Sequence, residues 1–194
     1  MRSAWVALIS VLFIPNACLA GNQQEEALSV SVRAGLHRAV SDFAAPEFSD
    51  PVAGQLWLKA MLPKLQKHIP ERQIREDFLQ TVHYEALRAG LDPQLVLALI
   101  QVESGFNKYA VSSAGARGFM QVMPFWLASI GASDQNLFHL RTNLRFGCTI
   151  LRHYLDMEHG NLNRALSRYN GDVNQQNYAN SVISLWHGNW AYRQ

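Results

Sequence analysis

The feature that most constrains the fold is a pair of consecutive segments with helical periodicity, separated by a very short connection. The first, ERQIREDFLQTVHYEALRAG, follows Pro70 and ends at Gly90, a residue that often terminates helices. The second opens at Asp92, whose side chain can cap a helix, with Pro93 at the first helical position. Its apolar run continues to about Glu103. The sequence therefore predicts two helices joined by a tight turn.

Most of the remaining chain shows the same periodicity, and period-2 strand patterns are nearly absent. Residues 25–43 are expected to be helical in part, although the stretch SVSV inside them could form a short strand. The stretch DFAAPEFSDPVAG contains two prolines and is predicted to be a connection. Further helices are expected near 56–69, 120–130, 142–158, 161–169 and 174–186. We therefore predict an all-α fold.

The size and net charge of the chain limit the classes of function that it can have. The chain has 194 residues, of which 48% are hydrophobic, and this suits one domain with a sizeable core. Its formal net charge of +2 is too small to favour nucleic acid as a partner, because such partners usually need a strongly basic patch.

The first twenty residues have the pattern of a secretory signal peptide. Arg2 is their only charge, an apolar stretch follows, and CLAG offers small residues around a cut after Ala20. The segment is too short and interrupted to span a membrane. We therefore predict export to the periplasm. In an alternative reading, Cys18 carries the lipid anchor of a lipoprotein, and only then is a membrane expected as a partner. Removal of Cys18 would leave Cys148 unpaired, and we expect that thiol to be buried and inert.

Glu103 is the candidate for acid–base chemistry. Val96, Leu99 and Ile100 lie seven, four and three residues before it, so they share its face of the helix. Desolvation on an apolar face and the negative end of the helix dipole both raise the pKa of a carboxyl group. A carboxylic acid that stays protonated near neutral pH can donate a proton. The alternative is a glutamate at a frayed helix end that points into water.

The residues after Glu103 point to a family. The run ESGFNKYAVSSAGARGFMQVMP resembles the signature of the soluble lytic transglycosylases, in which a Glu-Ser pair precedes an AVS…GA.GLMQ..P run. Downstream, NLRFG (143–147) and ALSRYNGD (165–172) are similar to two further blocks of that family. Phe119 replaces the usual leucine, Lys108 stands where proline is common, and Arg168 replaces a small residue. The resemblance covers roughly residues 82 to 185.

The resemblance implies a lysozyme-like helical domain with a deep glycan-binding cleft that cleaves peptidoglycan without a cofactor or a metal. Glu103 matches its single catalytic acid. We expect the domain to occupy residues 81–194, with a helical segment, 21–80, packed against it. By position, the residues that match the lining of the glycan cleft are Ser104, Ser112, Gln121, Met123, Tyr169 and Asn170. The Gly-rich loop is expected to lead into an apolar helix that carries Gln121.

The one-acid mechanism of the family implies cleavage between N-acetylmuramic acid and N-acetylglucosamine with closure of a 1,6-anhydro ring. Wall turnover, or local opening of the wall for a secretion or conjugation apparatus, are the two candidate roles. The first alternative is a hydrolytic muramidase in which Asp172 or Asp134 activates water. The second is a glycan-binding protein without activity. The stretch HYLDMEH holds two histidines without the HExxH spacing of a metallohydrolase, and both are interpreted as solvated helix residues.

Overall fold

The computed structural model describes residues 23–41, 44–131, 135–171 and 176–192. The predicted signal peptide, Cys18, Asp134 and Asp172 lie outside these residues. Two isolated bridges, Val111 with Arg117 and Arg117 with Val122, are the β-type pairing within the described ranges. Eight α-helices make up the described fold: α1 (Val30–Val40), α2 (Pro51–Leu65), α3 (Arg72–Arg88), α4 (Pro93–Ser104), α5 (Phe125–Ile130), α6 (Leu140–Met157), α7 (Leu162–Asn170) and α8 (Gln176–His187). The all-α prediction is confirmed.

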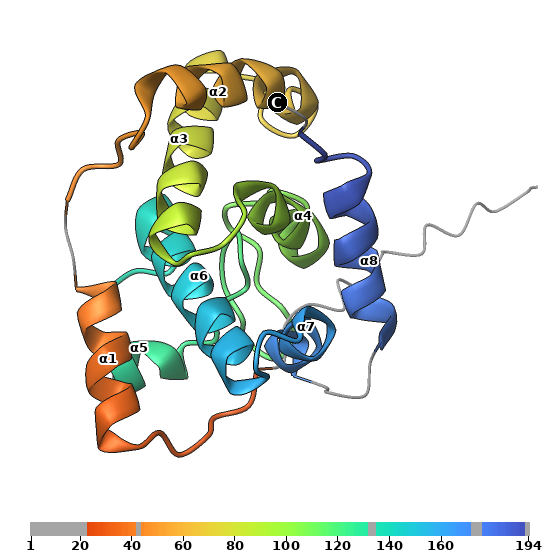
Figure 1. The fold of residues 1–194 in the computed structure, drawn as a ribbon. Coiled ribbons are helices and arrows are strands. Elements are labelled where there is room, and N and C mark those ends of the chain that lie inside the picture. Colours follow the sequence, from red (N-terminus) through yellow and green to blue (C-terminus); the bar gives the residue numbers. More distant parts are fainter. Residues whose placement is uncertain (1–22, 42–43, 132–134, 172–175, 193–194) are drawn as a thin grey trace, which may run out of the picture.

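Helix α4 forms the centre of the molecule (Figure 1). Its residues from Leu95 to Ile100 are all buried, so the helix is covered on every side for nearly two turns. Helices α3 and α8 pack directly against it, and α7 packs against α6 and α8. A helix apolar all round belongs in a core. The arrangement therefore places the carboxyl-terminal end of α4, which carries Glu103, inside the fold.

The ends of α4 follow the sequence prediction. The Asp92 carboxylate accepts hydrogen bonds from the backbone N–H groups of Gln94 (2.6 Å) and Leu95 (3.4 Å), which caps the amino terminus. At the other end Gly105 adopts a left-handed conformation with φ of 57°, which suits glycine and stops the helix directly after Ser104.

Three sequence predictions need correction at element boundaries. SVSV is not a strand, because the Ser29 hydroxyl accepts from the N–H of Val32 and caps α1, which includes the rest of that stretch. The expected connection through residue 54 ends at Asp50, whose carboxylate caps α2. The helix expected near 120–130 is only α5, because Gln121 has φ of 47° and cannot continue a right-handed helix.

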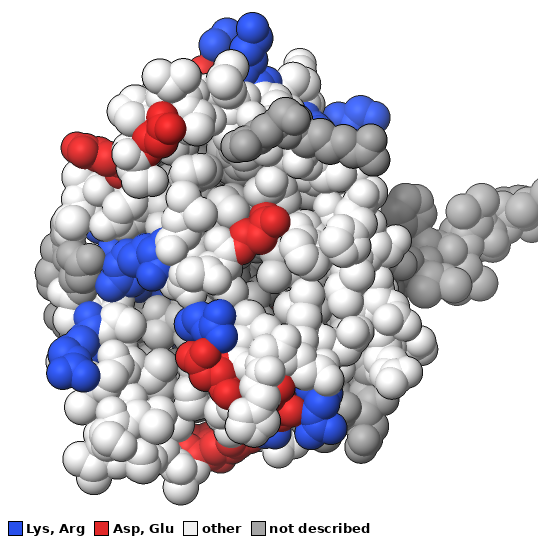
Figure 2. Space-filling view, viewed as in Figure 1, with Lys and Arg blue, Asp and Glu red and all other residues white. Residues whose placement is uncertain are grey.

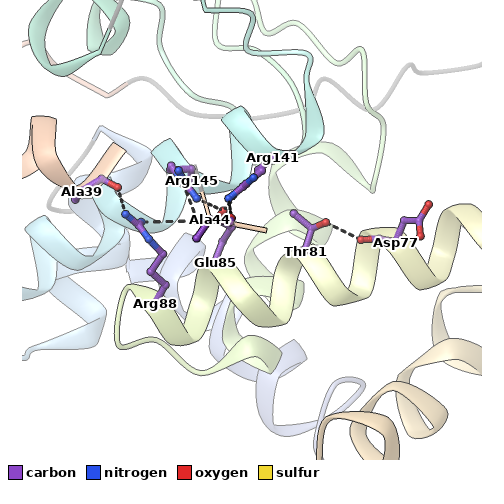
Figure 3. Close-up of polar contacts among 8 residues, drawn as sticks. All are labelled: Ala39, Ala44, Asp77, Thr81, Glu85, Arg88, Arg141 and Arg145. Carbon is purple, nitrogen blue, oxygen red and sulfur yellow. Dashed lines mark hydrogen bonds and ion pairs between the residues drawn. The ribbon is translucent and has the colours of Figure 1, made fainter. Parts of the chain in front are cut away.

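A buried ion cluster joins α3 to α6 (Figure 3). Glu85, fully buried on α3, accepts hydrogen bonds from Arg145 of α6 at 2.8 and 3.1 Å and from Arg141 at 3.4 Å. Arg88 also lies 3.8 Å from Glu85 and donates to the carbonyl oxygen of Ala39, just before the end of α1. The cluster thus connects the helical segment before α3 to the rest of the fold.

The amino-terminal helices rest on the later ones: α1 contacts α5 and α6, and α2 contacts α3. The predicted domain boundary after residue 80 falls inside α3, so one continuous helix crosses it. Cys148 is buried in α6, and burial raises the pKa of its thiol well above the usual value, as expected for an inert cysteine. No helix in the described part of the chain is long and apolar enough to cross a membrane.

Candidate active site

Glu103 projects from the last turn of α4 into the core and is fully buried. Burial raises the pKa of its carboxyl group to about 8, while a hydrogen bond from Tyr178 acts in the opposite direction. The Tyr178 hydroxyl, on α8, donates to Glu103 Oε1. The alternative of a glutamate pointing into water is therefore wrong. The carboxyl group is protonated at neutral pH and is held by a directional partner.

The loop between α4 and α5 is fastened to the Glu103 end of α4. The Ser104 hydroxyl donates to the carbonyl oxygens of Phe119 (2.7 Å) and Ile100 (3.2 Å). Ser104 therefore joins the helix end to the far side of the loop. This contact gives the Glu-Ser pair a physical reason, since the serine fixes the loop against the residue that carries the acid.

Helix α6 holds the same loop from the other side. The Asn143 side chain accepts from the N–H of Met120 (2.8 Å) and donates to the carbonyl oxygens of Arg117 (2.8 Å) and Leu137 (2.9 Å). One turn later, a Cβ on Gly147 would lie 2.4 Å from the Met120 sulfur. The asparagine and glycine of the NLRFG block therefore share one face of α6 and together fix the position of Met120.

Gln121 lies within the loop, not on a helix, which corrects the sequence expectation. Its side-chain amide donates to the carbonyl oxygens of Gly118 (2.8 Å) and Ala110 (3.1 Å), and the residue is 1% exposed. Ser112 also stabilises the loop, since its hydroxyl accepts from the N–H of Ala116 at 3.1 Å. Met123 is half-buried and packs against the core.

Tyr169 and Asn170 form the last turn of α7, which Gly171 ends in a left-handed conformation. The Tyr169 hydroxyl is buried and donates to the carbonyl oxygen of Met120 at 2.8 Å. Burial raises the pKa of Tyr169 well above its usual value, and the nearby charge of Glu103 raises it further. Tyr169 therefore supports the loop at Met120, and Asn170 beside it is 8% exposed.

The structure thus gathers Ser104, Gln121 and Tyr169 around the loop at the Glu103 end of α4. Two residues of the candidate site were missed from the sequence. Tyr178 contacts the acid directly. Gln23, 3% exposed, bonds to the backbone of Gln121 and Met123. Local pattern could not indicate either contact, because each joins segments far apart in the chain.

Two of the later carboxylates are engaged away from Glu103. Asp156 pairs with Arg152, and Glu158 pairs with Arg164 and with Arg168 at 2.6 Å. These hydrogen bonds hold the pKa of Glu158 below its ordinary value. Of the two histidines interpreted as solvated helix residues, His153 is half-buried on α6 and His159 is exposed just after the end of that helix. Within the described ranges no group of three or more His, Cys, Asp or Glu side chains could hold a metal ion.

Comparison with known proteins agrees with this arrangement. Residues 80–182, more than half of the chain, match the family described as "Transglycosylase SLT domain". The chain is 36% identical over 99 residues to "Transglycosylase" of Enterobacteria phage PRD1, covering 51% of this chain and 36% of that protein. It is 43% identical over 63 residues to "Membrane-bound lytic murein transglycosylase C" of Glaesserella parasuis serovar 5, covering 32% and 17%.

The chain spans about a third of the phage protein's length and about a sixth of the second relative's. No solved structure matches it. The match includes α4, the loop after it, α6 and α7, so it covers Glu103 and the residues that position it. The chain is therefore a member of the SLT transglycosylase family, with an all-helical, lysozyme-like domain.

Proposed function

We propose that this protein is a peptidoglycan lytic transglycosylase in which Glu103 is the catalytic acid and base. The observation that carries the proposal is the full burial of Glu103, which raises its pKa to about 8. At neutral pH a glycan would therefore meet a carboxylic acid that can donate a proton. Family membership supports the same reaction class.

The proposed reaction has two proton transfers through one residue. Glu103 protonates the glycosidic oxygen between N-acetylmuramic acid and N-acetylglucosamine as that bond breaks. The 6-hydroxyl oxygen of the muramic acid then bonds to C1 of the same sugar, and the ionised Glu103 accepts the hydroxyl proton. The Tyr178 hydroxyl donates to Glu103 Oε1 and stabilises the carboxylate between the two steps. No water is consumed, and a 1,6-anhydro product leaves.

We further propose that the six cleft residues divide into two roles. Ser104 and Tyr169 use their hydroxyl groups to hold the backbone of Phe119 and Met120, and so they shape the wall of the site. Gln121 uses its amide in the same way. Ser112, Met123 and Asn170 remain candidates for direct contact with the sugar.

The site of action that we propose is the periplasm, after removal of residues 1–20, and the proposed substrate is the glycan strand of the cell wall. The helical segment 21–80 would serve to support the catalytic domain, 81–194. A secretion or conjugation apparatus is the proposed partner in the case of local wall opening. Acylation at Cys18 would instead place the protein at a membrane surface.

Mass spectrometry of products released from purified peptidoglycan tests the proposal. The transglycosylase gives muropeptides lighter by one water than hydrolysed ones, and Glu103→Gln gives almost none. Asp172→Asn is the matched control, since the one-acid reaction leaves Asp172 without a chemical role and most activity should remain. Reducing-end products together with an inactive Asp172→Asn would replace this proposal with a hydrolytic muramidase.

A further inference from the structure

A short segment ahead of α1 enters the candidate site. We call residues 23–28 the strap. Gln23 is 3% exposed, whereas the next four residues are exposed and the last is half-buried. In Figure 1 the red stretch before α1 runs back toward α7. The first residue of the strap is thus inserted into the core, although most of the strap lies on the surface.

The Gln23 carboxamide fills a position with the hydrogen-bonding pattern of an amide site. Its oxygen accepts from the N–H of Met123 (3.3 Å) and from Trp126 Nε1 (3.1 Å). Its nitrogen donates to the carbonyl oxygen of Gln121 (3.3 Å). Two donors and one acceptor therefore converge on one planar group. An acetamido substituent of a sugar offers the same acceptor oxygen and donor N–H.

This amide position lies near the helix end that carries the acid. Ser104 holds the loop at Phe119 to the end of α4, and Tyr169 holds the same loop at Met120. Two of the three backbone and side-chain partners of Gln23 belong to the loop fastened to the end of α4. Glu103 itself is fully buried. A glycan can reach the acid only after some part of this closed arrangement moves.

The contacts that hold the strap are weak enough to be released. Glu26 pairs with Arg168 at 2.8 Å, with 41% and 23% of the two side chains exposed, and exposed ion pairs contribute little. Gln24 donates to the carbonyl oxygen of Gly171 at 3.5 Å, the limit for a hydrogen bond. Arg168 is also the residue that stands where the resemblance to the family leads one to expect a small side chain.

We propose that the strap is a built-in competitor of the glycan: the Gln23 carboxamide occupies a position for a sugar acetamido group, and the Glu26–Arg168 pair holds it there. Substrate binding requires release of the strap. The inference rests on the proposed function, because peptidoglycan sugars carry the acetamido groups with which Gln23 would compete. The strap would thus keep the active site partly closed in an enzyme that cuts the cell wall.

Calorimetric binding of a peptide-free tetrasaccharide of alternating N-acetylglucosamine and N-acetylmuramic acid tests the proposal. Glu103→Gln serves as background, so the ligand is not consumed. Adding Gln23→Ala or Glu26→Gln should tighten binding by roughly 3- to 10-fold, because less ligand affinity is spent on displacing the strap. Glu25→Gln is the matched control: it removes the same charge at the neighbouring exposed position and should leave the affinity unchanged.

Thermal unfolding of each variant shows whether it is folded, and the exposed Glu26→Gln change keeps the test open if Gln23→Ala is unstable. Equal or weaker binding by folded Gln23→Ala and Glu26→Gln overturns the competitor role and makes the strap a wall of the site. If Glu25→Gln changes the affinity for the tetrasaccharide as much as Glu26→Gln does, the role of the ion pair is overturned. Absence of binding by every variant rejects the proposed function itself, and the inference with it.

Discussion

Burial of Glu103 affects both chemistry and stability, because it keeps the carboxyl group protonated and makes its ionisation unfavourable for the folded state. Its pKa is about 8 in the folded chain, against 4.5 for an unburied glutamate. The folded state therefore binds one more proton than the unfolded state between these two values. The contribution of the protonated Glu103 to the stability of the fold is therefore complete below about pH 4.5 and is lost as the pH rises through about 8.

Glu103→Gln should remove this pH dependence, because an amide does not ionise in that range. We expect the variant and the parent to unfold at similar temperatures at acidic pH. At alkaline pH the variant should be the more stable, by up to about 5 kcal/mol. Denaturant unfolding at a series of pH values measures the difference. A constant difference from acid to alkali would contradict the raised pKa.

Tyr178→Phe tests the partner of the acid. The Tyr178 hydrogen bond lowers the pKa of Glu103, so its loss should move the alkaline limb of the activity profile to higher pH. The maximal rate should fall about 10- to 100-fold, because a hydrogen bond to a charged group contributes about 1.5–3 kcal/mol. A pH–rate profile on soluble glycan fragments gives both quantities. Tyr192→Phe, a change outside the site, provides a control for general effects of removing a phenol.

For individual residues, the sequence could predict the position of Glu103 but not its hydrogen-bond partner, Tyr178. Apolar residues three, four and seven positions earlier place the carboxyl group on a buried face, and this depends only on helix geometry. Tyr178 is 75 residues away from Glu103, and nothing near it in the chain indicates the contact. Gln23 is further still from the loop that it meets, so its role follows only from the packing of α1, α5 and α6.

Among the elements, the loop between α4 and α5 is the one whose conformation the site most requires. Gly118 has φ of 76°, and a Cβ there would lie 2.4 Å from the Asn143 side-chain nitrogen and 2.6 Å from the carbonyl oxygen of Leu137. Asn143 is the residue that holds the loop at Met120. The glycine is therefore needed both for its backbone conformation and for the close approach of α6.

Gly118→Ala should destabilise the fold by more than about 3 kcal/mol, because left-handed strain of about 1–2 kcal/mol adds to a steric clash. Gly115→Ala is the matched control: Gly115 also has positive φ, 90°, but nothing lies within 4 Å of its added Cβ. It should cost only the backbone strain. Urea unfolding of both variants measures the difference, and equal losses would mean that the contact with Asn143 is not limiting.

The start of α5 shows why this element was mispredicted. An apolar run from residue 120 favours a helix by periodicity, but the Met120 N–H is taken by Asn143 and the Val122 N–H by Arg117. Both contacts depend on how α6 and the loop pack, which no local pattern reports. The helices α3, α4, α6 and α7, whose apolar periodicity lies within their own sequence, were predicted to within a few residues.

At the scale of the whole molecule, the Glu85 cluster joins the early helices to the family domain. Arg145 is 4% exposed and makes two hydrogen bonds to the Glu85 carboxylate, so removal of that charge would leave a buried guanidinium without its counter-ion. On the face in Figure 2 the charged side chains stand in small groups, several with blue and red side by side, among uncharged residues. The burial of Glu85 and Arg145 distinguishes their pair from these surface groups.

Glu85→Gln should lower the free energy of unfolding by about 3–5 kcal/mol, as for other buried pairs that lose one partner. The comparison is Glu76→Gln on the same helix, whose partner Arg72 is 78% exposed, so that the lost pair should contribute less than about 1 kcal/mol. Guanidinium unfolding followed by circular dichroism measures both. Similar losses for the two variants would show that the buried cluster contributes no more than a surface pair.

The Glu26–Arg168 pair has a further consequence, which concerns ionic strength. The Debye length falls from about 30 Å at 0.01 M salt to about 8 Å at 0.15 M, so added salt screens an exposed pair of this kind. An uncharged N-acetylglucosamine oligomer has no charge of its own to be screened. If the strap competes with such a sugar, salt should loosen the strap and tighten sugar binding, and Glu26→Gln should make that affinity independent of salt.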